Sequence, residues 1–140
     1  MDKNRLRRYQ AIVRERDQLG QQIAALVDTL EAPKTAKLSS TPEGSKPEGS
    51  ALESLVVKKL ELVALYQAKQ AELIEEQVAI EHAIDSLEPT ARTLLRYKYI
   101  KGLKWEDICE RMAYSWRQIH RLHGNALAAL KAKEEKEQTI

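Results

Sequence analysis

The 140 residues of this chain are 31% charged, 43% hydrophobic and 5% aromatic, a balance that is typical of a soluble helical protein and excludes a large aromatic core. The single cysteine, Cys109, excludes an internal disulfide and a thiolate zinc site. The net charge of +2 is unevenly distributed, because residues 51–88 hold eight acidic and three basic residues whereas residues 89–130 hold eight basic and three acidic residues.

Residues 1–31 are predicted to form an amphipathic helix. Apolar side chains recur there at steps of three and four residues: Leu6, Tyr9, Val13, Ile23, Val27 and Leu30. Arg16 and Gly20 fall on the same stripe, so the apolar seam is imperfect. The helix start is basic, with Lys3, Arg5, Arg7 and Arg8 either contacting phosphate or simply facing solvent. No apolar signal core follows Met1, so we expect a cytoplasmic chain.

Residues 32–50 and 51–87 are predicted to complete a long helical hairpin. The first segment is rich in Pro, Gly, Ser, Thr, Lys and Glu, a composition that favours a disordered loop. The second has a heptad-like stripe formed by Leu52, Val56, Val63, Tyr66, Leu73, Ile80, Ile84 and Leu87. Gln70 and Gln77 on this stripe either fix the register or lie at a solvated part of the seam. The hairpin is a possible coiled coil and a possible homodimer surface, and no stretch is apolar enough to span a membrane.

Residues 88–131 are predicted to form three short helices that end in a helix-turn-helix, followed by a charged tail over residues 132–140. Pro89 is suited to the first position of a helix over residues 91–100, and Gly102 to the residue after its end. Residues 105–112 form the next helix, and Ala113 and Tyr114 the turn. Ser115 and Gln118 match a capping box, so a new helix begins at Trp116. Small and apolar side chains are expected where the two helices cross: Cys109, Ile108, Met112, Tyr114, Ile119 and Leu122.

The side chains left outside this apolar contact are polar and basic, which suits a helix lying in the major groove of double-stranded DNA. The predicted DNA-binding residues are Ser115, Trp116, Arg117, Gln118, His120, Arg121, Asn125, Lys98, Lys101 and Lys104. Two of them carry alternatives. Trp116 either reaches DNA or packs on the preceding helix, and His120 either touches phosphate or makes no contact.

The same region resembles the region-four DNA-binding domain of bacterial sigma factors. The resemblance rests on Leu87-Glu88-Pro89, Arg92, Leu95-Arg96-Tyr97, Gly102-Leu103, Trp105-Glu106-Asp107-Ile108, Ser115, Ile119 and Ala126-Leu127. The family's usual Ala and Gly in the second helix and turn are Cys109 and Ala113 here. Over its whole length the chain is similar to small phage or prophage proteins of the sigma-like or late-gene transcriptional regulator type. That resemblance implies promoter binding, RNA polymerase as a further partner, and a place at the nucleoid of a bacterial host.

We therefore expect an all-α transcription regulator and not an enzyme. The sequence has no glycine-rich phosphate loop, nucleophile elbow or paired catalytic carboxylates, so no cofactor is expected. His82, His120 and His123 lack further ligands at usable spacing, which speaks against a metal site. Two other functions stay open at this point. One is a small terminase-type DNA-packaging protein, although its DNA-binding domain usually comes first. The other is a helical module that binds a protein such as RNA polymerase.

Overall fold

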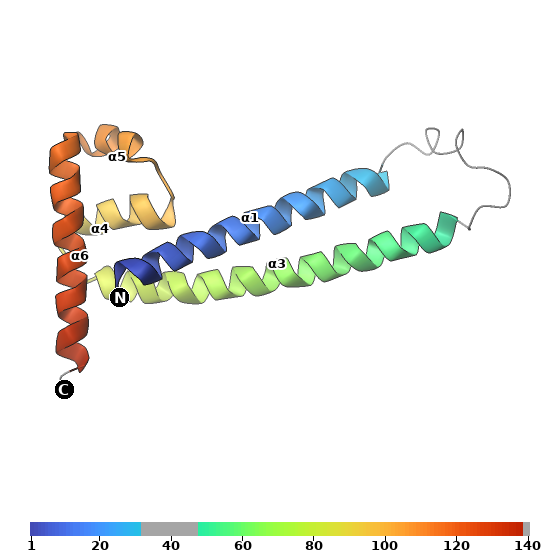
Figure 1. Ribbon diagram of the computed structural model, residues 1–140, viewed down its shortest axis with the longest axis horizontal. Helices are drawn as coiled ribbons and strands as arrows, with labels where there is room; N and C mark the ends of the chain where they lie inside the picture. The colour runs from blue at the N-terminus through green and yellow to red at the C-terminus, as the bar shows by residue number, and fades with distance from the viewer. Residues whose placement is uncertain (32–47, 139–140) are drawn as a thin grey trace. The chain divides into compact units, whose positions relative to one another are not determined.

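The computed structural model describes residues 1–31 and 48–138, and every regular element in these two ranges is helical. The elements in chain order are α1 (Lys3–Glu31), α3 (Glu48–Ile84), α4 (Pro89–Leu95), η1 (Arg96–Ile100), α5 (Trp105–Met112) and α6 (Trp116–Gln138) (Figure 1). The all-α prediction is therefore confirmed. The predicted disordered loop falls almost wholly outside the described residues, except that Glu48–Ser50 begin α3.

Several element bounds differ from the sequence-based expectation. α3 ends at Ile84, and the chain turns there through a hydrogen bond from the Leu87 amide to the Ile84 carbonyl (2.9 Å). The helix expected over residues 91–100 begins two residues earlier and finishes as η1, a π-helical turn in which the Lys101 amide donates to the Arg96 carbonyl (2.9 Å). α6 continues to Gln138, so most of the segment expected to be a charged tail is helical.

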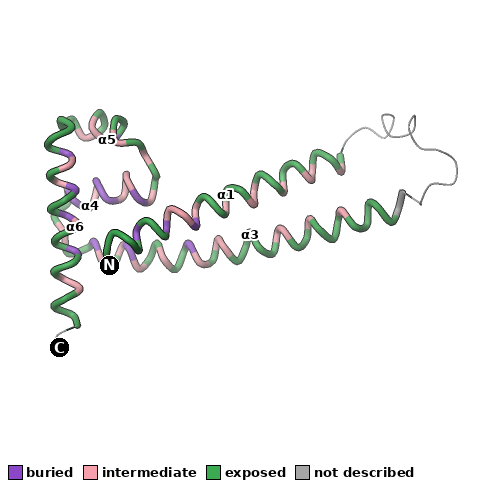
Figure 2. Tube along the Cα trace, viewed as in Figure 1, coloured by how far each residue is buried: buried purple, intermediate pink, exposed green. Residues whose placement is uncertain are grey.

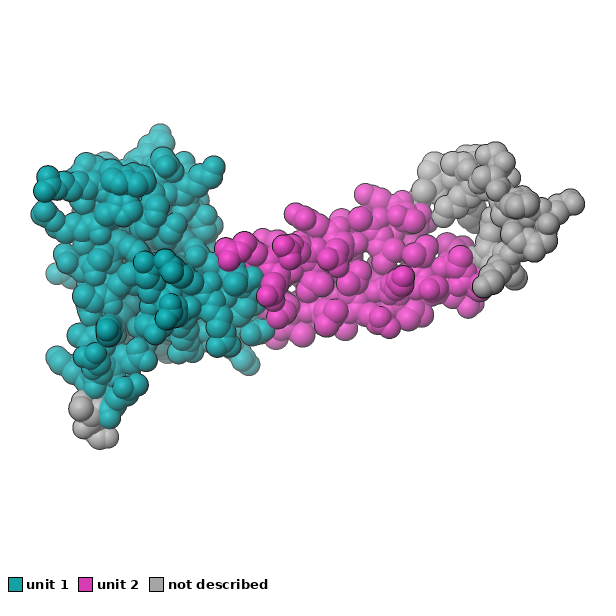
Figure 3. Space-filling model, viewed as in Figure 1, with its two compact units in different colours: residues 1–13, 72–140 teal, residues 14–71 magenta. Residues whose placement is uncertain are grey.

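The chain divides into two compact units (Figure 3). Unit 1 consists of Met1–Val13 and Glu72–Ile140, and unit 2 of Arg14–Ala71. Every residue in the described ranges that is classed as buried belongs to unit 1 (Figure 2). This is expected, because a two-helix unit cannot enclose a side chain from all directions.

Unit 2 pairs part of α1 with part of α3 through a seam that is partly polar. The half-buried Arg16 donates from Nη1 to the side-chain oxygen of Gln70 (3.0 Å), and Lys69 forms an ion pair with Glu15 (2.9 Å). A Cβ on Gly20 would lie 3.4 Å from the ring of Tyr66, so the glycine gives that ring room. The two residues that made the sequence seam imperfect, Arg16 and Gly20, thus each have a definite neighbour on α3.

Unit 1 has a core built from both ends of the chain. One buried cluster joins α1, α3, α4, η1 and α6; its largest members are Leu6, Tyr9, Ile12, Leu73, Ile80, Ile84, Leu95, Tyr99 and Leu130. The second cluster joins Leu94, Ile108 and Ile119, from α4, α5 and α6. The first turns of α1 therefore complete the same core that holds α4 to α6.

Candidate nucleic-acid interface

The turn between α5 and α6 spans three residues, and its geometry follows from their backbone chemistry. Ala113 has φ 57° and ψ 40°, the left-handed conformation that commonly ends a helix. The Tyr114 amide donates to the Cys109 carbonyl (3.1 Å) and the Ala113 amide to the Glu110 carbonyl (3.3 Å). These bonds satisfy carbonyls that the end of α5 would leave unpaired, and they reverse the chain sharply toward α6.

A reciprocal capping box starts α6, as the sequence predicts. The Ser115 hydroxyl accepts a hydrogen bond from the Gln118 amide (3.2 Å), and the Gln118 side-chain oxygen accepts one from the Ser115 amide (2.9 Å). Two backbone donors at the helix start are thus satisfied by side chains. Ser115 is exposed, and this capping role gives its hydroxyl a structural partner.

Packing of α5 on α6 and α4 leaves one side of α6 free in unit 1. Ile108 and Ile119 are fully buried against Leu94, and Cys109, Met112 and Leu122 pack around them. Tyr114 was expected at this crossing but lies outside the contact. It is 37% exposed, because the left-handed residue before it turns the chain away from α5. The remaining predicted residues at the crossing lie in the cluster.

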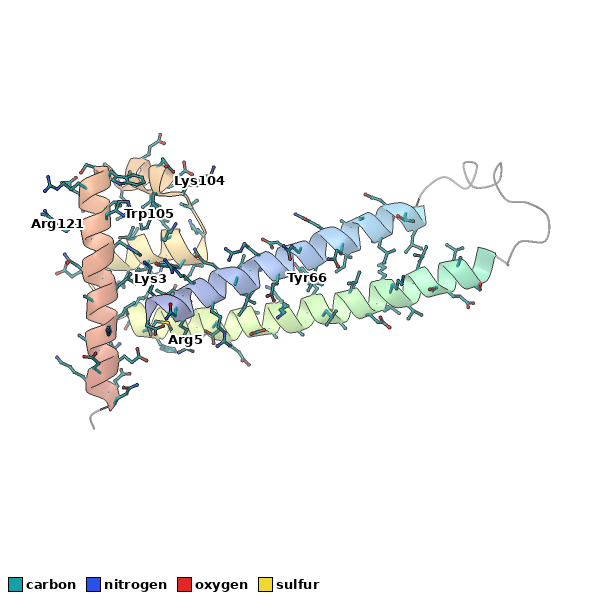
Figure 4. The ribbon with its side chains drawn as sticks, viewed as in Figure 1. Lys3, Arg5, Tyr66, Lys104, Trp105 and Arg121 are labelled. Carbon is teal, nitrogen blue, oxygen red and sulfur yellow. The ribbon has the colours of Figure 1, made fainter. Side chains whose placement is uncertain are left out.

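The exposed side of α6 carries Arg117, Gln118, Arg121 and Asn125. Arg117 and Arg121 are four residues apart, and Gly124 follows three residues later, so the three share one side of the helix. Arg121 is labelled on α6 in Figure 4. From Arg111 to Lys133 the sequence has no Asp or Glu, so this face has no acidic side chain of its own.

His120 lies between two indole rings, an arrangement that sequence analysis left undecided. Its ring centroid is 4.7 Å from that of Trp105 and 4.5 Å from that of Trp116. Its Nε2 atom is buried and has no hydrogen-bond partner among the described residues. Trp116 is 54% exposed, so it both covers His120 and presents its outer surface to solvent. Trp116 and His120 are four residues apart, a spacing that places them on one side of α6, whereas nothing in the sequence indicates the approach of Trp105 from α5.

The three predicted lysines are near the start of α5. Lys98 Nζ lies 4.6 Å from the centroid of the Trp105 ring and Lys101 Nζ lies 5.4 Å from that of Tyr97, distances typical of cation–π contacts. Lys104 is exposed at the residue before α5 (Figure 4). Lys98 is only partly exposed, whereas Lys101 and Lys104 are open to solvent.

Residues 52–131 match a protein family described as "Protein of unknown function (DUF1492)", which covers more than half of the chain. The chain belongs to the DUF1492 family. DUF1492 is phage-associated. No curated protein and no solved structure matches the chain.

The DUF1492 match includes α4, η1, α5, all but the last residues of α6, and α3 from Leu52 onward, whereas α1 lies outside it. Every predicted DNA-binding residue falls within the DUF1492 region. In the described part of the chain, no helix has the length and apolar character needed to cross a membrane. No group of three His, Cys, Asp or Glu residues in the described ranges is arranged to hold a metal ion.

Beneath this surface of the DUF1492 region, His123 of α6 and Tyr99 of η1 form a buried polar pair. The Tyr99 hydroxyl and His123 Nε2 are 2.8 Å apart, and the two rings are stacked at 5.8 Å. Burial, reinforced by Lys3, His120, Lys98 and Arg7, lowers the pKa of His123 to about 4. Burial also raises the pKa of Tyr99. Both side chains are therefore uncharged at neutral pH.

Proposed function

We propose that this chain is a phage or prophage transcription regulator that binds double-stranded DNA, with α5 and α6 acting as a helix-turn-helix. The observation that carries the proposal is the outward side of α6. Arg117, Gln118 and Arg121 are exposed in its first two turns, directly after a capped helix start and opposite the buried Ile119. In helix-turn-helix proteins, residues at this end of the second helix contact base edges.

The chemistry of this face suits the major groove. Arginine donates two hydrogen bonds to guanine, and glutamine or asparagine pairs with adenine. The first half of α6 has two arginines, one glutamine and one asparagine on exposed positions. Lys101 and Lys104 are exposed near the start of α5 and are suited to phosphate contacts, which strengthen binding without selecting sequence.

The stacked residues take secondary roles in this proposal. His120 is enclosed by Trp105 and Trp116, so we assign it to supporting the start of α6 instead of contacting bases. The exposed surface of Trp116 is suited to contact with the DNA backbone. A contact with RNA polymerase and a location at the nucleoid are further parts of the proposal, and they rest on the resemblance to sigma region four. The role proposed requires no catalytic residue and no cofactor.

The decisive experiment is a binding-site selection from random duplex DNA with the full chain and its variants. Arg117→Ala should relax preference at particular base pairs, by about 1–3 kcal/mol of discrimination. Gln118→Ala should do so beyond the effect of Ser115→Ala, which also opens the capping box. Arg14→Ala is the matched control, because Arg14 is an exposed arginine of α1 in unit 2. Arg14→Ala should select the same DNA sequence as the wild type. If the Arg117 and Gln118 variants select the wild-type site with unchanged stringency, base recognition does not lie on α6.

Chromatin mapping in the bacterial host tests the regulatory part of the proposal separately. Enrichment at promoters is expected for a transcription regulator. Enrichment at a packaging site would instead identify a DNA-packaging role with the same DNA-binding face.

A further inference from the structure

A small cavity in unit 1 brings together basic residues from opposite ends of the chain. Its volume is about 220 Å³, and Lys3 and Arg7 of α1 line it together with Lys98 of η1. Lys3 and Arg7 are four residues apart, so they project from the same side of α1. In Figure 4, Lys3 is labelled on α1 and Trp105, which also lines the cavity, at the start of α5.

The cavity has positive side chains in its lining and no carboxylate. Neighbouring cations of unit 1 have acidic partners: Arg5 pairs with Glu76 (3.1 Å) and Arg96 with Glu81 (2.7 Å). No ion pair involves Lys3, Arg7 or Lys98 among the residues that the structure describes. Three like charges around one hollow repel one another, and a concave surface with one sign of charge concentrates the field felt by a counter-ion.

Fixed contacts hold the walls of this cavity in place. Lys98 Nζ rests over the ring of Trp105, and the Lys98 carbonyl accepts a hydrogen bond from Gln10 Nε2 (2.8 Å), which links η1 to α1. His123, also in the lining, is held by Tyr99. The side of the pocket formed by η1 and α6 is therefore ordered before any ligand arrives, which reduces the entropy that binding must overcome.

We propose that this cavity, the Lys3–Arg7–Lys98 pocket, binds a phosphate group. Arginine forms paired hydrogen bonds with phosphate oxygens, and lysine ammonium groups supply point charges to the same oxygens. The phosphate comes either from the backbone of a DNA duplex or from a small phosphorylated ligand such as a nucleotide. The lining of the pocket includes none of Arg117, Gln118 and Arg121, the residues proposed to contact bases. Its phosphate affinity does not depend on the proposed base recognition, and only the duplex source of the phosphate rests on the proposed function.

The direct test adds inorganic phosphate to the full chain and follows side-chain signals by NMR. Ionic strength is held constant, and chloride in place of phosphate is the reference. Phosphate should shift the side-chain signals of His123 and Trp105 and raise the pKa of His123, because a bound anion offsets the surrounding positive charge. Arg7→Gln should remove these changes and Arg7→Lys should largely keep them. Arg8→Gln is the matched control, since Arg8 is exposed and does not line the pocket.

A second measurement distinguishes the two sources of phosphate. If a backbone phosphate occupies the pocket, Arg7→Gln should reduce the slope of log affinity against log salt for duplex DNA by about 1, and Arg8→Gln should not. An unchanged slope together with NMR shifts would identify a small phosphorylated ligand. Both results support the pocket, even if base recognition by α6 fails its own test. The proposal is overturned if phosphate affects His123 and Trp105 of the wild type no more than chloride does, or if Arg7→Gln responds like Arg8→Gln.

Discussion

His123 makes the stability of unit 1 depend on pH through a single buried side chain. It is 9% exposed and its pKa is lowered to about 4, against an ordinary value of about 6.5. Because the unfolded chain takes up the proton more readily, this residue's contribution to stability is present above pH 6.5. It is lost as the pH falls toward 4.

We expect His123→Gln to reduce this pH dependence. Between pH 7 and pH 4.5, the wild type should lose about 2 kcal/mol of unfolding free energy more than the variant does. Urea unfolding of both proteins at the two pH values measures this difference. Both proteins have the same carboxylates, so the contribution of carboxylate titration cancels. His82→Gln removes an exposed histidine and should behave like the wild type. If the unfolding free energies of the wild type and of His123→Gln depend equally on pH, His123 is not buried in its uncharged form.

Gly124 is a glycine inside α6 that the fold does not require. A Cβ at this position would meet no atom within 4 Å, and glycine within a helix costs about 0.5–1 kcal/mol relative to alanine. It shares the exposed side of α6 with Arg117 and Arg121. A small residue there allows a partner to approach the helix backbone closely, in agreement with the proposed position of DNA.

Gly124→Ala should therefore separate stability from binding. The free energy of unfolding should rise by about 0.5–1 kcal/mol, while affinity for the selected duplex falls because the added methyl group meets the DNA. Ser54→Ala on an exposed position of α3 is the control that improves a helix away from α6. A more stable Gly124→Ala protein with wild-type affinity would place this part of α6 away from the DNA.

The sequence predicts the helices and turns correctly where local chemistry decides the structure. The bounds of α5, the turn at Ala113 and the capping box of Ser115 and Gln118 depend on residues within five positions of one another. The end of α3 and the π-helical turn of η1 were not predictable in this way. Leu87 continues the heptad stripe in sequence, yet it packs on the core of unit 1 from outside the helix.

Two alanine-to-glycine substitutions, one in the turn between α5 and α6 and one within α6, should change the free energy of unfolding in opposite directions. Ala113 has a left-handed backbone that costs an L-residue roughly 1 kcal/mol, so Ala113→Gly should stabilise the chain by up to about 1 kcal/mol. Ala129→Gly, at an exposed position within α6, should destabilise it by about 0.5–1 kcal/mol. Denaturant unfolding of both variants measures this. A destabilised Ala113→Gly protein would contradict the left-handed turn.

At the scale of the whole molecule, the sequence predicted which segments are helical but not how they divide into units. The apolar stripe of α1 is compatible with pairing along the full length of α3. In the structure, Leu6, Tyr9 and Ile12 belong to the core that also contains Ala126 and Leu130 of α6. No local sequence pattern indicates which residues more than a hundred positions apart will pack together. For the same reason the sequence left Lys3 and Arg7 undecided, and their neighbour Lys98 became apparent only in the fold.

The outward side of α3 carries exposed apolar side chains, and we therefore predict that unit 2 pairs with a second copy of itself, which the sequence left as a possibility. Within unit 2, Val56, Val57 and Leu60 are 44%, 52% and 62% exposed, and the two valines lie four and three residues before Leu60. α3 is therefore apolar on the side facing α1 and on a second side as well. A helix that is apolar on both sides is normally covered on both. A second copy of unit 2 is a suitable cover, because two such helix pairs can form a four-helix bundle with a buried seam.

Leu60→Glu tests this arrangement, and the chain supplies its own control. Sedimentation of the full-length protein should show a dimer for the wild type and a monomer for Leu60→Glu, because the new carboxylate would be buried in the seam. Leu65→Glu introduces the same charge at a leucine that is 54% exposed, but its position five residues along α3 points to another side of the helix. It should remain dimeric. A monomeric wild type, or equal effects of the two substitutions, would show that the apolar side of α3 is not the dimer contact.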